Sequence, residues 1–508
     1  MTQQTTTVVK GSVWLIGAQV ASFGMQLVYA AISSRLVGPI SFAAYAIAFS
    51  AVALVGILAN AGLGQALTRD ADLPVATQRA VSTFAVATGL AAGAAVLALS
   101  DVWTSLWGGT NEANSAVQWL ALSSFVAPFL GVLFGHSRRN SQFIYLAVVQ
   151  FSCSFSGTIL GLVILYFERT ATGLLGNILI TQFLLLLILL AKYRKVCLPG
   201  KVSRADLVYL RFSGKVTLSN LGYYIQQNSP RLFVGRIFGQ QVLGYWNRAE
   251  VLTMVPFQAV QTAFIQTVYP QFSRVGGDLE RSRRAWTLML SLGVWFCLPT
   301  GVLLAVLLPN IIRVIYGPGL QSASHLAPAL AMAWCLLPLM SLLAAGLEQR
   351  GNFRLIYISQ FLSLIAVAAT LLISLLLRNE YLAVIALVTG LGLQHIVQLA
   401  IAKRLHLIET WSVVKEYCAA VLFSIAIGSA SLAVGGFAQR NLSGPLLVLV
   451  FQFVTASAIA GLLITVAGRR LTAYQVLRGL GGANRGPYDN ANERNSVNDS
   501  GELKRGRS

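Results

Sequence analysis

Polar side chains recur at helical spacing inside a long apolar run near the start of the sequence. They are Gln19, Ser22, Gln26, Tyr29 and Ser33, separated alternately by three and four positions. Residues at this spacing lie on one face of a helix. Their amides and hydroxyls can hydrogen-bond a polar ligand or a neighbouring helix. The stripe therefore faces either a hydrated cavity or another helix, and both interpretations remain open.

A second stripe follows about 201 residues later. Its members are Asn220, Tyr224, Gln227 and Arg231. At this offset Gln19 corresponds to Asn220, and Gln26 to Gln227. The next apolar run adds a third set at spacings of four: Gln258, Thr262 and Gln266. Matching stripes in two halves of the chain favour a shared central lumen.

Four arginines stand toward one end of these runs: Arg35, Arg231, Arg236 and Arg248. A guanidinium fork matches the geometry of phosphate oxygens and stays charged at any relevant pH. Arg35 and Arg236 lie at the ends of predicted helices, where snorkelling to lipid phosphates competes with a role in the lumen. Arg231 lies deeper and on the polar stripe, which favours a role in the lumen. The candidate binding residues are these arginines together with Gln19, Gln26, Asn220, Tyr224, Gln227 and Gln258.

The runs that carry these residues have the length and composition of transmembrane helices. Of 508 residues, 56% are hydrophobic and 11% are charged, whereas soluble domains carry roughly a quarter charged residues. A membrane-spanning helix needs about 20 apolar residues, and the runs are too continuously apolar for the alternating strands of a barrel. The sequence predicts an all-α integral membrane protein of about fourteen helices. We place them at 11–33, 41–63, 80–100, 115–137, 142–167, 172–192, 213–237, 246–268, 286–308, 324–346, 354–377, 380–402, 414–436 and 443–467.

Basic residues accumulate on one side of this predicted topology. The loops that share a side with both termini hold most of the lysines and arginines, including Arg138, Arg139, Lys192, Arg283 and Arg284. The positive-inside rule then places both termini in the cytoplasm, which requires an even number of spans. The net charge of +20 is explained by orientation and by attraction to anionic lipids, and it does not call for a nucleic-acid partner.

A short motif after the first span is repeated after the seventh. Arg35-Leu36-Val37-Gly38 corresponds to Arg236-Ile237-Phe238-Gly239. A duplicated unit of six helices keeps the same orientation in both copies. We therefore expect a six-helix bundle at 1–192, a cytoplasmic linker at 193–212, a second bundle at 213–403, two additional helices at 404–468 and a disordered cytoplasmic tail at 469–508.

Metal, cofactor and catalytic chemistry have no support in the sequence. The five cysteines form no CxxC pair, and the four histidines lack metal-ligand spacing. Acidic residues at membrane depth are almost absent, since Glu250 and Glu348 fall near the ends of predicted spans. A proton or sodium relay usually needs a buried carboxylate, so an ion relay is not expected.

The chain resembles the polysaccharide transporter family of the multidrug/oligosaccharidyl-lipid/polysaccharide exporter superfamily. The resemblance rests on Arg35 to Pro39 with Tyr45, and on the stretch from Val234 to Ala249. It continues at Val268 to Arg274 and at Val314 to Pro318, and it spans essentially residues 11–467. The family often has an acidic residue just before the Gly-Arg segment, where this chain has Pro230-Arg231, so an ion-coupling role of that segment is not carried over.

The resemblance implies a V-shaped pair of six-helix bundles that opens alternately to each side of the bacterial inner membrane. It also implies a non-enzymatic flippase for undecaprenyl-diphosphate-linked oligosaccharide repeat units of an exopolysaccharide or lipopolysaccharide. In that role arginine would hold the diphosphate, and Gln, Asn and Tyr would contact sugars. A polysaccharide polymerase and export machinery become candidate partners.

Two other functions compete with this one. A cation-coupled drug or small-molecule antiporter of the same superfamily would need a deep carboxylate. A polysaccharide polymerase or polyprenyl-dependent glycosyltransferase would need a sizeable outer loop with acidic, His or Arg residues. The longest outer segment, near 101–114, offers only Asp101 and Glu112 with two tryptophans, which are typical of membrane-interface anchors.

Overall fold

The structure is a computed structural model that describes residues 17, 21–22, 24–60, 67, 74–140, 142–198, 200–203, 207–274, 279–441 and 444–467. These residues contain no strand. Residues 24–36 are helical and precede α2 (Pro39–Asn60). The rest of the N-terminal half consists of α4 (Val75–Ala98), α5 (Ser100–Leu106), α6 (Asn111–Arg139), α7 (Phe143–Phe167) and α8 (Ala171–Cys197).

The C-terminal half includes two further long helices after its bundle. It contains α9 (Leu207–Ile237), α10 (Gln240–Arg274), α11 (Leu279–Tyr316), η2 (Pro318–Leu320), α12 (Ala323–Trp334), α13 (Leu337–Gln349), α14 (Phe353–Leu377), α15 (Glu380–Arg404), α16 (Thr410–Asn441) and α17 (Pro445–Ala467).

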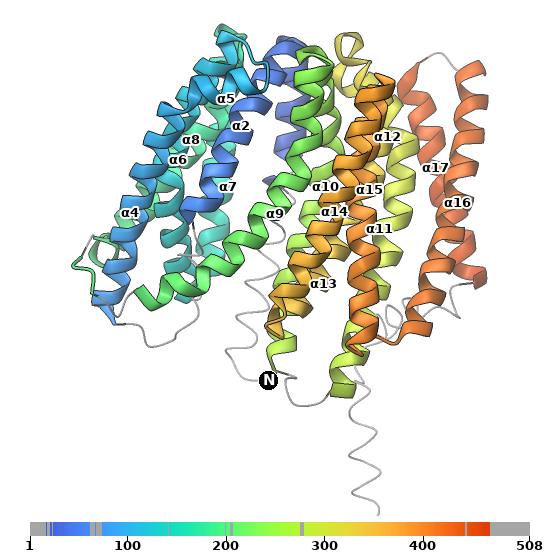
Figure 1. The fold of residues 1–508 in the computed structure, drawn as a ribbon. Coiled ribbons are helices and arrows are strands. Elements are labelled where there is room, and N and C mark those ends of the chain that lie inside the picture. The colour runs from blue at the N-terminus through green and yellow to red at the C-terminus, as the bar shows by residue number, and fades with distance from the viewer. Residues whose placement is uncertain are drawn as a thin grey trace, which may run out of the picture.

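The helices form two bundles and a flanking pair, as predicted (Figure 1). In the first bundle α6 packs against α2, α4 and α8, and α7 packs against α8. In the second, α9 and α15 pack against α14, while α10 and α11 pack against α12. The pair α16 and α17 attaches to the second bundle through α11. In Figure 1 the two bundles stand close together at the top and farther apart at the bottom.

Eleven segments of the described chain are long and apolar enough to span a membrane. Helices α9 and α10 run with them in Figure 1 but are not among the eleven. Both carry many polar residues, which is the composition expected of helices that face the interior of the protein rather than lipid. The protein is thus a multi-pass membrane protein, and the total of fourteen spans stays a prediction.

Several boundaries differ from the predicted ones. Helix α10 begins at Gln240, six residues before the predicted span, and α8 and α9 extend into the predicted linker. The predicted span 324–346 is divided into α12 and α13, and Pro338 stands in the first turn of α13, where proline is tolerated because its missing N–H would have no partner in the helix. The predicted tail, most of 11–23 and Gln19 lie outside the described residues.

The predicted repeat is visible in the helix boundaries. Helical residues end at 36 and α2 begins at Pro39, while α9 ends at Ile237 and α10 begins at Gln240. Both boundaries are displaced by 201 residues, the offset of the sequence motif. In the second copy the turn passes through Gly239, whose φ of 102° is strained for any residue with a Cβ.

Contacts between the two bundles gather at the top of Figure 1. We call this set the seam and define it by Arg35, Pro39, Trp107, Gly108, Gln240, Gly244 and Val314. Arg35 Nη2 donates to the Val314 carbonyl at 3.2 Å, and Gln240 Nε2 donates to the Gly108 carbonyl at 2.8 Å. A Cβ on Gly244 would lie 1.9 Å from the Pro39 carbonyl oxygen, so glycine is required where α10 crosses the start of α2.

Candidate functional site

A cavity of about 460 Å³ lies between the two bundles. Its walls come from helical residues 24–36, α2, α7 and α8 on one side and from α9 and α10 on the other. Ser154 and Thr158, in the middle of α7, are part of the wall, which places the cavity deep within the spanning region. The polar lining consists of Ser22, Gln26, Tyr29, Tyr45, Ser154, Thr158, Asn177, Thr181, Gln182, Arg231, Asn247, Arg248, Glu250 and Gln258.

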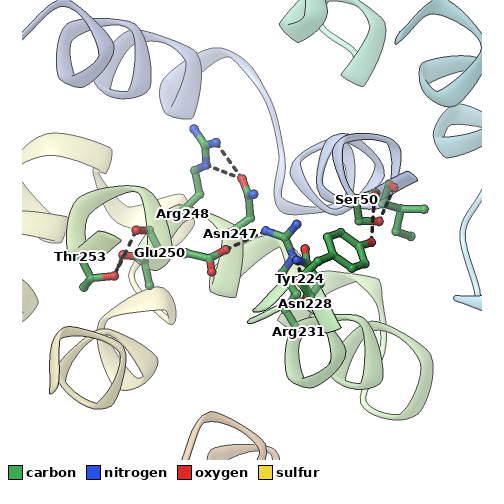
Figure 2. A network of polar contacts seen from close by, with 10 residues as sticks. Ser50, Tyr224, Asn228, Arg231, Asn247, Arg248, Glu250 and Thr253 are labelled. Carbon is green, nitrogen blue, oxygen red and sulfur yellow. Dashed lines mark hydrogen bonds and ion pairs between the residues drawn. The ribbon is translucent and has the colours of Figure 1, made fainter. Parts of the chain in front are cut away.

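An ion pair joins α9 to α10 in the cavity wall (Figure 2). Arg231 Nη1 lies 3.0 Å from Glu250 Oε2, and the two side chains are only 11% and 5% exposed. In a low-dielectric interior each charge would be costly by itself, so the pair depends on both partners. Arg231 is therefore neutralised by the protein and is not a free cation.

The expectation that no carboxylate lies at depth is wrong for Glu250. The residue is 3% exposed. Because α10 starts at Gln240 rather than near 246, Glu250 lies ten residues into the helix, about 15 Å along its axis at 1.5 Å per residue. The error came from the predicted helix boundary, which placed Glu250 at the edge of a span.

Arg248 is the second arginine of the cavity, and its environment differs from that of Arg231. Arg248 is 5% exposed. Its guanidinium carbon lies 3.8 Å from the centroid of the Phe42 ring on α2. Its Nε and Nη2 donate to the Asn247 side-chain oxygen at 3.3 and 2.8 Å. Within the described part of the chain no ion pair includes Arg248.

The local structure holds Arg248 in place. Tyr316, in the last turn of α11, donates its hydroxyl to the Arg248 carbonyl at 3.1 Å. The cation on the Phe42 ring is a cation–π contact between the two bundles. Figure 2 shows the guanidinium pointing away from the Arg231–Glu250 pair. With two arginines and one glutamate as its charged lining residues, the cavity carries one uncompensated positive charge.

Four of the predicted site residues line the cavity: Gln26, Arg231, Arg248 and Gln258. Arg35 belongs to the seam, and Arg236 is exposed near the same end. Tyr224 is buried and donates its hydroxyl to the Ser50 carbonyl at 2.8 Å, which ties α9 to α2. Asn220 is exposed and Gln227 is half-buried, and neither lines this cavity. Gln19 lies outside the described residues.

The repeat thus places its two stripes differently. In the first stripe Ser22, Gln26 and Tyr29 all reach the cavity, whereas in the second only Arg231 does. The Tyr29 hydroxyl also donates to the Leu174 carbonyl at 3.0 Å, so part of the first stripe serves helix packing as well. Both interpretations of the stripe hold, each for different residues.

Sequence reasoning missed the contribution of α7 and α8. Ser154 and Thr158 are four residues apart on α7, as are Asn177 and Thr181 on α8. This is the same spacing that identified the first stripe, so the signal was present. The two helices approach closely because Gly161 faces Asn177, where an added Cβ would lie 2.6 Å from the backbone nitrogen. Small residues allow such approach between membrane helices.

Comparison with known proteins assigns the chain to a family. Residues 32–325 match the family model described as polysaccharide biosynthesis protein. The chain belongs to this family. The predicted resemblance is thereby confirmed.

Two curated relatives support the assignment. Lipopolysaccharide biosynthesis protein WzxC of Escherichia coli (strain K12) is 22% identical over 311 residues, which cover 61% of this chain and 63% of that protein. Succinoglycan biosynthesis transport protein ExoT of Rhizobium meliloti (strain 1021) is 25% identical over 302 residues, 59% of each chain. The matches therefore span about three fifths of the length of these relatives.

Two solved structures share the fold of this chain. Lipid II flippase MurJ in an inward closed conformation has a TM-score of 0.68 at 12% identity, over 90% of this chain and 99% of that one. An inward-facing transporter of the multidrug resistance MATE family has a TM-score of 0.62 at 16% identity, over 78% of this chain and 98% of that one. At these identities the likeness concerns the fold alone.

Proposed function

We propose that this protein is a flippase that moves undecaprenyl-diphosphate-linked oligosaccharide repeat units across the bacterial inner membrane for exopolysaccharide or lipopolysaccharide biosynthesis. The observation that carries the proposal is Arg248, a buried guanidinium without an acidic partner in the described chain, in the wall of a cavity between two bundles. Such a cation attracts an anion, and its planar donors match a phosphate group.

The remaining lining supports a ligand that combines a diphosphate with sugars. Amides and hydroxyls from the first bundle line the same cavity as Arg248, including Gln26, Asn177 and Tyr45. These groups donate and accept hydrogen bonds, as sugar hydroxyls require. Ligand pockets of about 300–1,000 Å³ enclose molecules of drug size, so the cavity has room for a diphosphate and the sugar next to it. The polyprenyl chain would stay in lipid, between the bundles.

Alternating access follows from where the contacts lie. The seam closes one end of the molecule, and the excess of basic residues at the other end assigns that end to the cytoplasm. Both termini would then be cytoplasmic, and the seam would be the outer gate. A ligand that contacts Arg248 on α10 and Gln26 on the first helix bridges the two bundles. Its affinity for the closed and open states would differ, and this difference drives the exchange between them.

A cation-coupled antiporter remains the second candidate, because the cavity holds the carboxylate Glu250. Its carboxylate is already held in an ion pair with Arg231, so it is not a free ligand for a transported cation. A polymerase has less support, since the described residues bring no group of three acidic or histidine side chains to the outer segment near 101–114. Under the flippase proposal a polymerase and export machinery would receive the translocated repeat unit.

The test is to delete the gene and to follow the lipid-linked intermediate. A flippase defect should leave complete repeat units on the cytoplasmic leaflet, protected from an enzyme added outside. If the units reach the outer leaflet and remain unpolymerised, the protein is a polymerase and the proposal fails. If repeat units are exported normally and the strain becomes drug-sensitive, the antiporter is correct. Purified protein in liposomes should also expose a labelled lipid-linked sugar to the opposite side.

A further inference from the structure

A second cavity, of about 740 Å³, lies at the basic end of the molecule, between the second bundle and the flanking helix pair. Its wall combines Arg283 near the start of α11, the residues His406, Ile408 and Glu409 between α15 and α16, and the first turns of α16. It shares no lining residue with the central cavity. The flippase proposal gives it no role.

The charges of this cavity are balanced. Arg283 and Lys415 contribute two cations, and Glu409 and Glu416 contribute two carboxylates. Glu416 is 6% exposed and accepts a hydrogen bond from Trp295 Nε1 on α11 at 2.6 Å. The Glu409 backbone nitrogen donates to Thr287 Oγ1 at 2.8 Å. These two bonds fix both carboxylate-bearing residues to α11, so the site is built rather than formed by mobile surface chains.

The cationic side of the cavity retains unused donors. Arg283 Nη2 pairs with the exposed Glu280 at 3.3 Å, but its Nε is buried without a partner in the described chain. Lys415 Nζ lies 5.2 Å from the Trp411 ring centroid. An ammonium over an aromatic face keeps its donors available to an anion. A phosphate group between Arg283 and Lys415 would use them.

The cavity lies where the lipid-facing surface begins. Trp411, in the first turn of α16, is 70% exposed. Beyond it the exposed face of α16 continues with Val414, Leu422 and Ile425. Tryptophan is enriched at the membrane–water interface, and basic pockets between helices bind lipid head groups there. A lipid in this position would place its acyl chains along α16 and its head group in the cavity.

We propose that this cavity binds the head group of a phospholipid that carries both a phosphate and a primary ammonium, as phosphatidylethanolamine does. The phosphate would contact Arg283 and Lys415, and the ammonium would donate to Glu409 and Glu416. A purely anionic head group would meet two carboxylates at close range, and a purely cationic one would meet two cations. A zwitterion offers a counter-charge to both sets, since charge-assisted hydrogen bonds are the stronger ones. Choline lacks N–H donors and would lose the bonds to the carboxylates.

The bound lipid would join α11 to α16 at the basic end. Deeper in the membrane the same helices are joined through α17. Asn310 Nδ2 donates to the Gln452 side-chain oxygen at 2.8 Å, and Gln452 Nε2 donates to the Ser431 carbonyl at 3.3 Å. The lipid would thus add to the direct contacts between α11 and α16 at the basic end, outside the transport path.

Lipid binding to the purified, delipidated full-length protein tests the proposal without any transport measurement. Native mass spectrometry with phosphatidylethanolamine, phosphatidylcholine and phosphatidylglycerol gives three affinities. We expect ethanolamine lipid to bind about tenfold more tightly than choline lipid, the ratio that one charge-assisted hydrogen bond provides. Equal binding of all three, or tighter binding of the glycerol lipid, would overturn the proposal in favour of unspecific or anionic-lipid association.

Lys415 is exposed and Glu409 is half-buried, so variants at both positions should fold. Lys415→Gln should weaken ethanolamine and glycerol lipids alike, and Glu409→Gln should remove the preference of ethanolamine over choline. Lys403→Gln is the matched control, since Lys403 is an exposed cation in the last turn of α15 and does not line the cavity. An equal loss in Lys403→Gln would show that bulk charge, not the cavity, holds the lipid, and would refute the assignment. Because these variants lie outside the central cavity, failure here leaves the flippase proposal untouched.

Discussion

The guanidinium of Arg231 lies 3.0 Å from the carboxylate of Glu250, so that of the two arginines in the central cavity only Arg248 keeps an uncompensated charge. The two arginines, which are alike in the sequence, therefore have different roles. Arg231 links α9 to α10, and Arg248 is the group that an anionic ligand would meet. This division leads to separate predictions for the two residues.

Removal of Glu250 should destabilise the protein. In Glu250→Ala the Arg231 charge stays buried without a partner, which costs about 3 kcal/mol or more. Thermal unfolding in detergent measures the loss as a lower Tm. The double variant Arg231→Met/Glu250→Leu removes both charges and should recover most of the stability. If the single and double variants are equally unstable, the pair is not what stabilises this part of the wall.

Replacement of Arg248 should impair transport more than stability. We expect Arg248→Gln to lower export by roughly ten- to a hundredfold, because a hydrogen bond to a charged group contributes about 1.5–3 kcal/mol. Arg248→Lys should keep part of the activity, since a point charge remains but the planar fork is lost. Arg236→Gln is the control, as Arg236 is exposed and outside the cavity. Export that is unchanged in Arg248→Gln at normal protein levels would argue against an anion at this position.

Gln26 and Gln227 should differ in water accessibility, although they match in the repeat. Gln26 lines the cavity and Gln227 does not. Cysteine at position 26 should therefore react with a polar thiol reagent, and cysteine at position 227 should react much more slowly. Equal labelling of both would mean that the second stripe also faces water. The two halves would then be more alike in the membrane than they are in this structure.

A side chain at position 244 should open the seam. A Cβ there would lie 1.9 Å from the Pro39 carbonyl oxygen, and such overpacking typically costs about 1–3 kcal/mol. In Gly244→Ala we expect a cysteine at position 258 to become reactive from the outer side. Gly38→Ala is a close control, because no atom lies within 4 Å of the corresponding Cβ. A seam that stays closed in Gly244→Ala would show that α10 can shift without separating the bundles.

Loss of the Gln452 amide should loosen the flanking helix pair. The side chain accepts from Asn310 and donates to the Ser431 carbonyl, and such bonds between membrane helices contribute about 0.6–2 kcal/mol each. Gln452→Leu should therefore increase proteolysis between α16 and α17 and lower the Tm. Val454→Ala, on the exposed side of the same helix, should change neither. An effect of equal size in Val454→Ala would point to a general sensitivity of α17 instead.

The sequence alone determined that this protein folds in a lipid bilayer and that its architecture is duplicated. Long apolar runs can satisfy their backbone in lipid only as helices, so the class of fold followed from composition. The repeat at 201 residues was readable because the same short Arg-x-x-Gly motif marks both helix boundaries in the sequence itself. The stripe through Gln26 was readable because residues three and four apart on a helix share a face whatever their surroundings.

Only the tertiary structure decided which side chains meet. Arg231 and Glu250 belong to different helices, and nothing in their spacing shows that their charges compensate each other. The same stripe spacing brings Gln26 to the cavity but leaves Gln227 outside it, because each helix rotates to fit its own neighbours. Pairing across helices and the direction of a helix face arise from packing between distant segments, and a periodic pattern carries no information about them.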